Sequence, residues 1–324
     1  MCTAISYRKS NHYFGRTLDV EFTFRESVVI TPRSYLFNLR NGKSYRNKFA
    51  LIGMAAVMEN YPLYYEASNE MGLSMAGLNF PGSAIYNAPR DDMDNITPFE
   101  LIPYVLGQAK SVDEAREIIS KINLTKIAFA TGMGISPLHF MLSDSKESIV
   151  VEPLENGLKI YNNPYNVMTN NPPFDYHLWN MQGYLNLSAK NGENEFSDEY
   201  TLGNYAVGMG AVGLPGDYSS SSRFIRAAFN LTNSQNSDNE LDNVTQFFHI
   251  LSSVSMVKGA VITDDDKNDI TRYTCCINAT DGIYYYTTYD NSTINAVSLN
   301  NVDLDSQDLF IYELRDSQTI SYQN

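Results

Sequence analysis

Polar and apolar residues alternate at the start of the chain, in segments 2–7 and 12–20. Successive side chains of a β-strand point to opposite faces, so this alternation predicts two strands. The polar residues 8–11 between them predict the turn of an N-terminal hairpin. Segments 47–57 and 72–80 are mostly small and apolar with few interruptions, which indicates two further strands that are buried.

Four later segments are predicted to be helices: 97–108, 111–122, 219–231 and 241–254. The first opens with Thr97 as a cap and Pro98 at the first helical position, and its apolar residues have helical spacing. The second opens with a capping box formed by Ser111 and Glu114, and an alanine and three isoleucines follow on one face. A run of serines caps the third.

Two more groups of strands are predicted. Segment 148–163 is a strand pair around an Asn-Gly turn, and segment 272–299 contains three strands joined at Asp281-Gly282 and Asp290-Asn291. Antiparallel groups of strands with helices between the groups are typical of the α+β class, whereas βαβ proteins alternate strand by strand. No shift of composition marks a linker, so we expect one domain over residues 1–324.

Charge and hydropathy narrow the choice of partners. The formal net charge is −14, and such a surface repels nucleic acid and anionic membranes. No Lys/Arg-rich run offsets this repulsion. No apolar segment is long enough to cross a membrane, and no apolar signal region follows Met1. We therefore expect a cytoplasmic protein that acts on a small molecule and binds neither nucleic acid nor membranes.

The sequence has no motif for a metal or an organic cofactor. It lacks a Walker motif, a dinucleotide fingerprint and an HExxH motif. The glycine-rich segment 208–213 lacks the following Lys and Ser/Thr of a phosphate-binding loop. The four histidines, His12, His139, His177 and His249, have no ligand spacing and are expected to be structural. We expect no cofactor and no metal.

Cys2 is one of three cysteines. Cys275 and Cys276 are neighbours in a predicted strand and should face opposite sides, which disfavours a disulfide between them. Cys2 differs, because a small second residue allows an aminopeptidase to remove Met1. A thiol and a free α-amine would then share one residue. The amine titrates at about 7.7–8.0 and can accept the thiol proton without a histidine.

Two charged residues of the predicted hairpin could complete this nucleophile. Arg16 lies on the second strand, which the hairpin places beside Cys2, and a guanidinium favours a thiolate. Asp19 could accept a hydrogen bond from the amine and orient it. The alternative is that Cys2 is an inert buried strand residue, while Arg16 and Asp19 form a surface ion pair.

Five segments resemble one protein family, in the same order along the chain. They are MCTAISY (1–7), YFGRTLD (13–19), MAGLNFPG (75–82), MTNNPPFDY (168–176) and GLPGDYSSSSRF (213–224). The chain resembles the choloylglycine hydrolase family of bile salt hydrolases and penicillin V acylases, which are N-terminal nucleophile hydrolases. The resemblance implies a four-layer αββα sandwich of two antiparallel sheets. It also implies a bacterial enzyme of lipid metabolism that forms a homotetramer.

The resemblance further implies roles for individual residues. Cys2 would be the nucleophile and its amine the base. Arg16 would contact the sulfur, and Asp19 would bind the amine. Asn79 and Asn170 would form the oxyanion hole, and Arg223 would be a second arginine near the nucleophile. We expect Arg16, Asp19 and Asn170 to converge on the sulfur and nitrogen of Cys2. Judged locally, Asn170 would instead belong to a polar turn before two prolines, and Arg223 would be an ordinary first-turn residue of a helix.

By the same resemblance, the chain should hydrolyse the amide bond of bile salts conjugated to glycine or taurine, through a thioester on Cys2. This substrate combines an apolar steroid plate with a small anionic tail, so the pocket should be apolar and built from loops near Cys2. We expect about half of the candidate wall residues to belong to the core instead. The candidates are Leu18, Phe22, Phe24, Met58, Tyr61, Leu63, Tyr64, Tyr65, Ile127, Phe129, Met133 and Ile135.

Two features bear on the choice of amide. Asn79 favours bile salts, because penicillin V acylases usually have a tyrosine at the matching position. Segment 129–136 departs from the family pattern, and its glycines and methionine suggest a mobile wall, so the substrate profile stays open. The alternatives are a penicillin V acylase, a hydrolase of another N-acyl amide such as an acyl-homoserine lactone, and a non-catalytic ligand-binding homologue. The retained charged and amide residues around Cys2 argue against the last.

Overall fold

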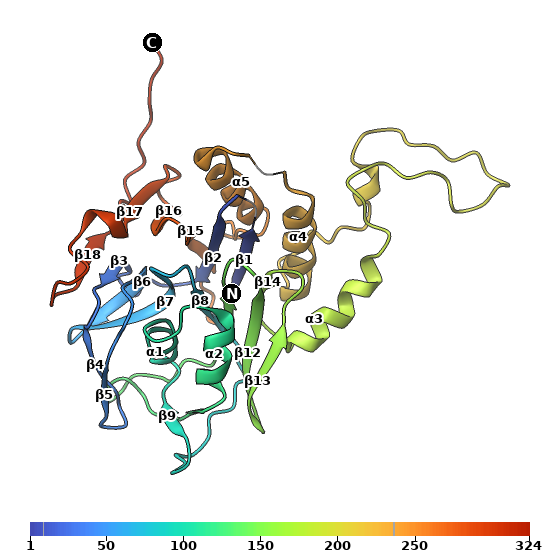
Figure 1. The fold of residues 1–324 in the computed structure, drawn as a ribbon. Coiled ribbons are helices and arrows are strands. Elements are labelled where there is room, and N and C mark those ends of the chain that lie inside the picture. The colour runs from blue at the N-terminus through green and yellow to red at the C-terminus, as the bar shows by residue number, and fades with distance from the viewer. Residues whose placement is uncertain (9, 236) are drawn as a thin grey trace.

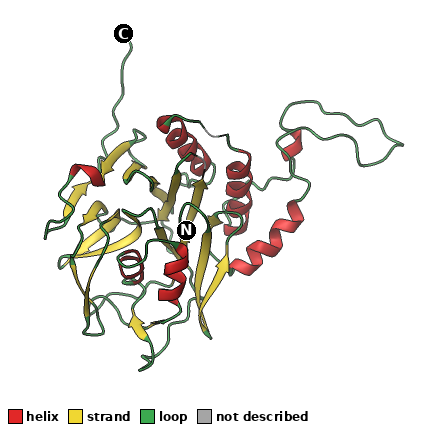
Figure 2. Cartoon of the chain, in the orientation of Figure 1, coloured by secondary structure: helices red, strands yellow, loops and turns green. Residues whose placement is uncertain are grey.

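Two antiparallel sheets stacked face to face form the centre of the molecule (Figure 1, Figure 2). The computed structural model describes residues 1–8, 10–235 and 237–324. The first sheet has the order β14 (Val167–Met168), β1 (Cys2–Arg8), β2 (His12–Val20), β15 (Ile270–Asn278), β16 (Ile283–Thr288) and β17 (Asn295–Ser298). The second has the order β13 (Gly157–Asn162), β12 (Ser148–Leu154), β11 (Leu138–Ser143), β8 (Ser74–Asn79), β7 (Tyr61–Asn69), β6 (Leu51–Met58), β3 (Ser27–Thr31) and β18 (Phe310–Glu313).

Helices cover both outer faces. The helices are α1 (Leu101–Leu106), α2 (Val112–Ile119), α3 (Phe174–Asn180), α4 (Ser220–Asn233) and α5 (Glu240–Ser252). Helix α4 packs on β1 and β14, and α5 packs on β2 and β15, whereas α1 lies on β7 and β8 of the second sheet. The result is the αββα sandwich that the resemblance implied. Small pairs β4 (Leu36–Asn38) with β5 (Ser44–Arg46), and β9 (Asp94–Ile96) with β10 (Ile122–Leu124), lie outside the two sheets.

The second sheet is buried on both faces, and β3 shows how the alternation of a strand produces this. Val28 and Ile30 point into the core between the sheets. Val29 points the other way and joins the core beneath α1 and α2. A strand of continuous apolar residues is therefore stable here, because each face meets a different apolar layer.

The N-terminal hairpin is confirmed. Strands β1 and β2 pair antiparallel, with Cys2 opposite Leu18 and Ala4 opposite Arg16. Of the predicted turn, Lys9 lies outside the described residues. The predicted strand pair at 148–163 and the three strands at 272–299 are also confirmed.

The prediction for the first helix was wrong at its start. Helix α1 begins at Leu101, and the residues from Pro98 to Glu100 form a turn. The carboxylate of Glu100 accepts the N–H of Thr97 at 2.9 Å, so Glu100 caps the turn and the Thr97 hydroxyl has no partner among the described residues. At α2 the Ser111 hydroxyl does accept the N–H of Glu114, as predicted.

A long arm, residues 185–213, projects from the body between α3 and α4 (Figure 1). It contains little regular structure beyond the short 3₁₀-helix Met209–Ala211. Its exposed side chains include Leu185, Phe196 and Tyr205. Across the described residues, none of the helices combines the length and apolarity that a membrane span requires.

Candidate active site

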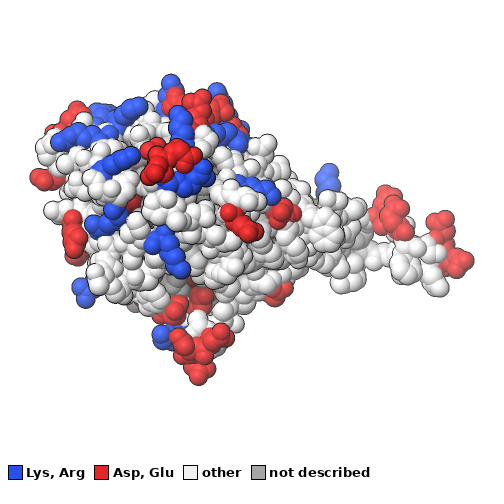
Figure 3. Space-filling view, turned by 90° about the horizontal axis from the view of Figure 1, so that it is seen from below, with Lys and Arg blue, Asp and Glu red and all other residues white. Residues whose placement is uncertain are grey.

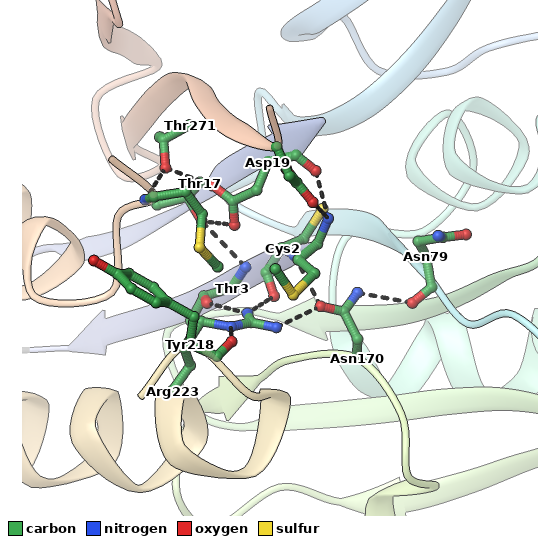
Figure 4. Close-up of polar contacts among 12 residues, drawn as sticks. Cys2, Thr3, Thr17, Asp19, Asn79, Asn170, Tyr218, Arg223 and Thr271 are labelled. Carbon is green, nitrogen blue, oxygen red and sulfur yellow. Dashed lines mark hydrogen bonds and ion pairs between the residues drawn. The ribbon is translucent and has the colours of Figure 1, made fainter. Parts of the chain in front are cut away.

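Cys2 begins β1, which lies between β14 and β2 in the first sheet, at the edge of a cavity of about 840 Å³. Its side chain is buried, yet the residue lines the cavity. Because Met1 is present, the nitrogen of Cys2 is a peptide nitrogen. It donates to Oδ1 of Asn170 at 2.8 Å (Figure 4). This nitrogen would become a free α-amine only on removal of Met1.

Arg16 reaches the sulfur from the neighbouring strand. Its Nη2 donates to Sγ of Cys2, while Nη1 donates to the main-chain oxygen of Gly77 at 2.6 Å and Nε donates to that of Thr17 at 3.1 Å. Burial opposes the charged form of Arg16, but the neighbouring Cys2 and acidic groups outweigh it and raise the pKa of Arg16 above its usual value. The guanidinium therefore stays charged, and it can stabilise a thiolate on Cys2.

The buried carboxylate of Glu66 lies close to Arg16. Oε2 of Glu66 lies 3.8 Å from Nε of Arg16, and the hydroxyls of Tyr273 and Tyr284 donate to Glu66 at 2.7 and 2.6 Å. Burial raises the pKa of Glu66, and Arg16 with the two hydroxyls opposes this increase. Sequence reasoning missed this residue, because a single glutamate within a predicted loop gave no sign of burial.

Asp19 is buried near the same end of β1. Its carboxylate accepts hydrogen bonds from the hydroxyls of Thr17 and Thr271 at 3.0 and 2.6 Å (Figure 4). Its main-chain oxygen accepts a bond from the α-ammonium of Met1. Burial raises the pKa of Asp19, and the Met1 ammonium and Arg223 counteract this. Asp19 thus contacts the present N-terminus, and its predicted bond to the amine of Cys2 stays a prediction for the processed chain.

Asn170 occupies the centre of the hydrogen-bond network in Figure 4. Its Oδ1 accepts bonds from the nitrogen of Cys2 and from Nη2 of Arg223, both at 2.8 Å, and its Nδ2 donates to the main-chain oxygen of Asn79 at 2.8 Å. The side chain of Asn79 is exposed and points away from Cys2. The side-chain amide of Asn170 therefore connects Cys2, Arg223 and the end of β8.

Arg223, in the first turn of α4, is fully buried. It donates to the main-chain oxygen of Cys2, to the hydroxyl of Thr3 at 2.8 Å and to the main-chain oxygen of Tyr218 at 3.0 Å. Burial lowers its pKa, and Asp19 and Cys2 act in the opposite direction. Arg223 thus holds the main chain of Cys2. The interpretation as an ordinary helix residue was wrong.

The apolar candidates surround the cavity with one exception. The lining includes Leu18, Phe22, Phe24, Met58, Leu63, Tyr64, Tyr65, Ile127, Phe129, Met133 and Ile135. The prediction that Tyr61 lines the cavity was wrong, because its ring packs on Phe37, Phe99 and Phe129 behind the cavity wall. The expected loop at 61–65 is also wrong, since these residues belong to strand β7. At the rim, the rings of Phe22 and Phe24 lie 4.5 Å apart, and Phe24 continues to Tyr65 at 5.6 Å.

Two buried histidines hold the segment that carries Asn170. Nε2 of His177 lies 3.1 Å from the main-chain oxygen of Asn170, and Nε2 of His139 lies 2.8 Å from that of Thr169. Nδ1 of His139 meets Glu152 at 3.1 Å. Burial lowers the pKa of His177 to about 4, so at neutral pH the ring is uncharged. The structural role expected for these histidines is confirmed, but no sequence signal linked them to Asn170.

Comparisons with known proteins agree along the whole chain. Residues 2–312 match the family described as linear amide C–N hydrolases, choloylglycine hydrolase family. A bile salt hydrolase/transferase of Lactiplantibacillus plantarum is 50% identical over 315 residues, which cover 97% of each chain. A crystal structure of a variant conjugated bile acid hydrolase from Clostridium perfringens has a TM-score of 0.92 at 35% identity and covers 100% of both chains.

A penicillin V acylase from Agrobacterium tumefaciens has a TM-score of 0.77 at 20% identity, covering 98% of this chain and 94% of its own. At that identity the likeness concerns the fold alone. Both structural relatives share the stacked antiparallel sheets described above.

Proposed function

Because the chain belongs to the choloylglycine hydrolase family of linear amide C–N hydrolases, we propose that it hydrolyses the amide bond of bile salts conjugated to glycine or taurine. The observation that carries this proposal is the pairing of Arg16 with Sγ of Cys2 at the edge of a largely apolar cavity of about 840 Å³. A charged guanidinium favours the thiolate, and the apolar walls suit a steroid plate.

The proposed reaction uses one residue for three tasks. After removal of Met1, the α-amine of Cys2 accepts the thiol proton, and the thiolate attacks the amide carbon. The resulting oxyanion needs donors already in place. The candidate is Nδ2 of Asn170, which uses one N–H on the main-chain oxygen of Asn79 and has a second N–H to offer. The α-ammonium then protonates the leaving nitrogen. Water, deprotonated by the same amine, hydrolyses the thioester and restores the thiol.

The anionic tail of a conjugate receives little help from the two active-site arginines. Each nitrogen of Arg16 and Arg223 already donates to a protein atom. Arg223 is fully buried and is not part of the cavity lining. The affinity for a bile salt should therefore come from burial of the apolar plate, and the tail should remain close to solvent.

The projecting arm supports the expected homotetramer. Tyr205 and Val207 are 88% and 95% exposed, and Leu185 and Phe196 are also open to solvent. Acidic side chains gather toward the end of the arm (Figure 3), so apolar contact would be confined to part of it. A second copy of the chain is the partner we propose, in a cytoplasmic assembly of single-domain subunits. Sedimentation tests this by comparing the oligomeric state of the full chain with that of a Tyr205→Ser, Val207→Ser variant.

Turnover of three amides by one preparation tests the substrate class. Glycocholate, taurocholate and penicillin V are compared by release of glycine, taurine and 6-aminopenicillanic acid. We expect either bile salt to exceed penicillin V in kcat/KM. Penicillin V well ahead of both bile salts would replace the proposal with a penicillin V acylase, and binding of bile salts without any turnover would indicate a ligand-binding homologue.

A further inference from the structure

The α-ammonium of Met1 is bound inside the catalytic cavity. It donates to the main-chain oxygen of Asp19 and lies 3.2 Å from Oδ2 of Asp269. In return, the N–H of Asp19 donates to the main-chain oxygen of Met1 at 2.9 Å. All three residues line the cavity. Removal of Met1, which the proposed mechanism requires, would expose a donor, an acceptor and a carboxylate at this position.

Asp269 has the features of a cation site. It is only 6% exposed, and its Oδ1 has no hydrogen-bond partner among the described residues. A buried carboxylate without a partner is costly, whereas an ammonium group would satisfy both its charge and its hydrogen-bonding capacity. Met1 satisfies part of this need in the precursor. The mature enzyme has to satisfy it in another way.

The new N-terminus of Cys2 is poorly placed to replace Met1. Its nitrogen is directed to Oδ1 of Asn170 at 2.8 Å, and its main-chain oxygen accepts from Arg223. Pairing with Leu18 in the sheet fixes the residue further. One residue of a strand advances the chain by about 3.3 Å, so the amine of Cys2 falls short of the Met1 position by roughly that distance.

The charges of the cavity favour a ligand that brings its own cation. Four acidic residues line it: Asp19, Glu21, Asp264 and Asp269. Within the described part of the chain, Arg16 is the one basic side chain in the lining, and it is engaged by Cys2 and main-chain oxygens. An ammonium group entering this end of the cavity would meet the carboxylate of Asp269, which loses its ion-pair partner when Met1 leaves.

We propose that Asp269 and the main-chain oxygen of Asp19 form a subsite for an ammonium group on the amine component of an amide substrate. The inference rests on the proposed function, because the subsite is vacated only when Met1 leaves the catalytic cysteine. The enzyme should then cleave amides of diamines better than amides of matched neutral amines. The covalent steps stay the same: the acyl group passes to Sγ, and the leaving nitrogen takes its proton from Cys2.

Two amides of cholic acid differing in one group test the subsite. N-(2-aminoethyl)cholamide ends in an ammonium, and N-propylcholamide replaces that ammonium with a methyl group. We expect kcat/KM of the processed enzyme to be about tenfold higher for the cationic amide, which corresponds to one charge-assisted hydrogen bond. Asp269→Asn should bring the ratio near one. Asp264→Asn removes the same charge from an exposed residue of the lining and should keep most of the preference.

Equal kcat/KM values of the wild-type enzyme for the two amides would overturn the subsite alone, since hydrolysis itself would stand, and this result does not depend on whether Asp269→Asn folds. Equal loss on both amides in Asp269→Asn would assign Asp269 to the amine of Cys2 and would also overturn it. If the enzyme hydrolyses none of the three compounds, neither of the two amides nor glycocholate, the proposed function is overturned as well. Intact mass establishes that Met1 is absent in every variant compared.

Discussion

The guanidinium of Arg16 donates to Sγ of Cys2 while it is fixed from behind by main-chain oxygens, including that of Gly77 at 2.6 Å. Main-chain partners in a sheet hold their positions far better than side chains do, so the positive charge is preorganised at the sulfur. Arg223 fixes the main-chain oxygen of Cys2 in the same way. The positive charges of this site are therefore engaged by protein atoms, and we expect them to contribute little to binding the anionic part of a ligand.

Replacement of Cys2, the proposed nucleophile, should abolish turnover. In Cys2→Ser, a hydroxyl has only an α-amine as its base, and it is a much poorer nucleophile than a thiolate beside Arg16. We expect glycocholate hydrolysis to fall by at least about 10³-fold, with an unchanged far-UV circular dichroism spectrum. Cys276→Ala, which removes a buried thiol from the same sheet, serves as control. Full activity of Cys2→Ser would refute the assignment.

Retention of Met1 should have the same consequence without any change of side chain. The nitrogen of Cys2 is then a peptide nitrogen that donates to Oδ1 of Asn170, and it has no useful basicity. We expect activity to follow the fraction of molecules whose intact mass lacks one methionine. A preparation with Met1 fully retained and normal kcat would contradict the role of the α-amine as base.

Asn170 and its neighbour Asn171 form a matched pair for testing the oxyanion site. The amide of Asn170 contacts Cys2, whereas that of Asn171 donates to the main-chain oxygen of Pro81 and to the hydroxyl of Ser83. Loss of one oxyanion donor typically lowers kcat by about 10²–10³-fold, which we expect for Asn170→Ala. Asn171→Ala should keep kcat within about threefold. Similar losses in both variants would indicate a merely structural turn.

Local pattern was sufficient for the hairpin but not for the helix at α1. Alternation over 2–7 and 12–20 depends only on which face of the sheet each residue occupies, and the observed pairing of Cys2 with Leu18 follows from it. The start of α1 depends on Glu100, whose carboxylate accepts the N–H groups of Thr97 and Arg40. The contact with Thr97 is local, but Arg40 is 60 residues away, so no local pattern could identify this second partner of Glu100.

The residues of the site also divide into those that the sequence could predict and those that depend on distant contacts. Arg16 beside Cys2 follows from hairpin geometry, and the positions of Asn170 and Arg223 were suggested by family resemblance. Asp269 contacts Met1 across 268 residues of sequence and comes from a loop with no motif. Contacts between residues so far apart in sequence are set by the packing of the two sheets, and a local sequence pattern cannot predict them.

The buried His177 makes stability depend on pH. Its pKa is lowered by burial to about 4, from about 6.5 in an unfolded chain. Between these values the unfolded chain binds a proton that the native protein does not, so the free energy of unfolding falls as pH falls from 6.5 to 4. The full effect is up to about 3 kcal/mol. Stability above pH 6.5 should be unaffected by this group.

A variant isolates this contribution from the other groups that titrate in the same range. His177→Gln keeps a donor for the main-chain oxygen of Asn170 but cannot be protonated. Urea unfolding at pH 7 and pH 4.5 should show a smaller loss of stability on acidification in the variant than in the wild type. His12, whose pKa is also lowered to about 4 by burial, is present in both proteins and cancels in the comparison. Equal losses in both proteins would contradict the assignment.

Variants of Tyr61 and Phe24 distinguish a residue that packs behind the cavity wall from one that forms the wall. The hydroxyl of Tyr61 is buried and has no partner among the described residues, so Tyr61→Phe removes an unsatisfied polar group and should stabilise the fold by about 1 kcal/mol. KM for glycocholate should not change, because Tyr61 packs against Phe37 and Phe99 and not against the cavity.

Phe24→Ala should give the opposite pattern. Phe24 is 42% exposed at the rim of the cavity and packs on Phe22 and Tyr65, so its removal affects the surface offered to the steroid plate more than the core. We expect KM for glycocholate to rise about tenfold, the factor that loss of roughly 1.4 kcal/mol of apolar contact produces. The urea midpoint should shift little. A raised KM in Tyr61→Phe with an unchanged KM in Phe24→Ala would reverse the assignment of these two rings.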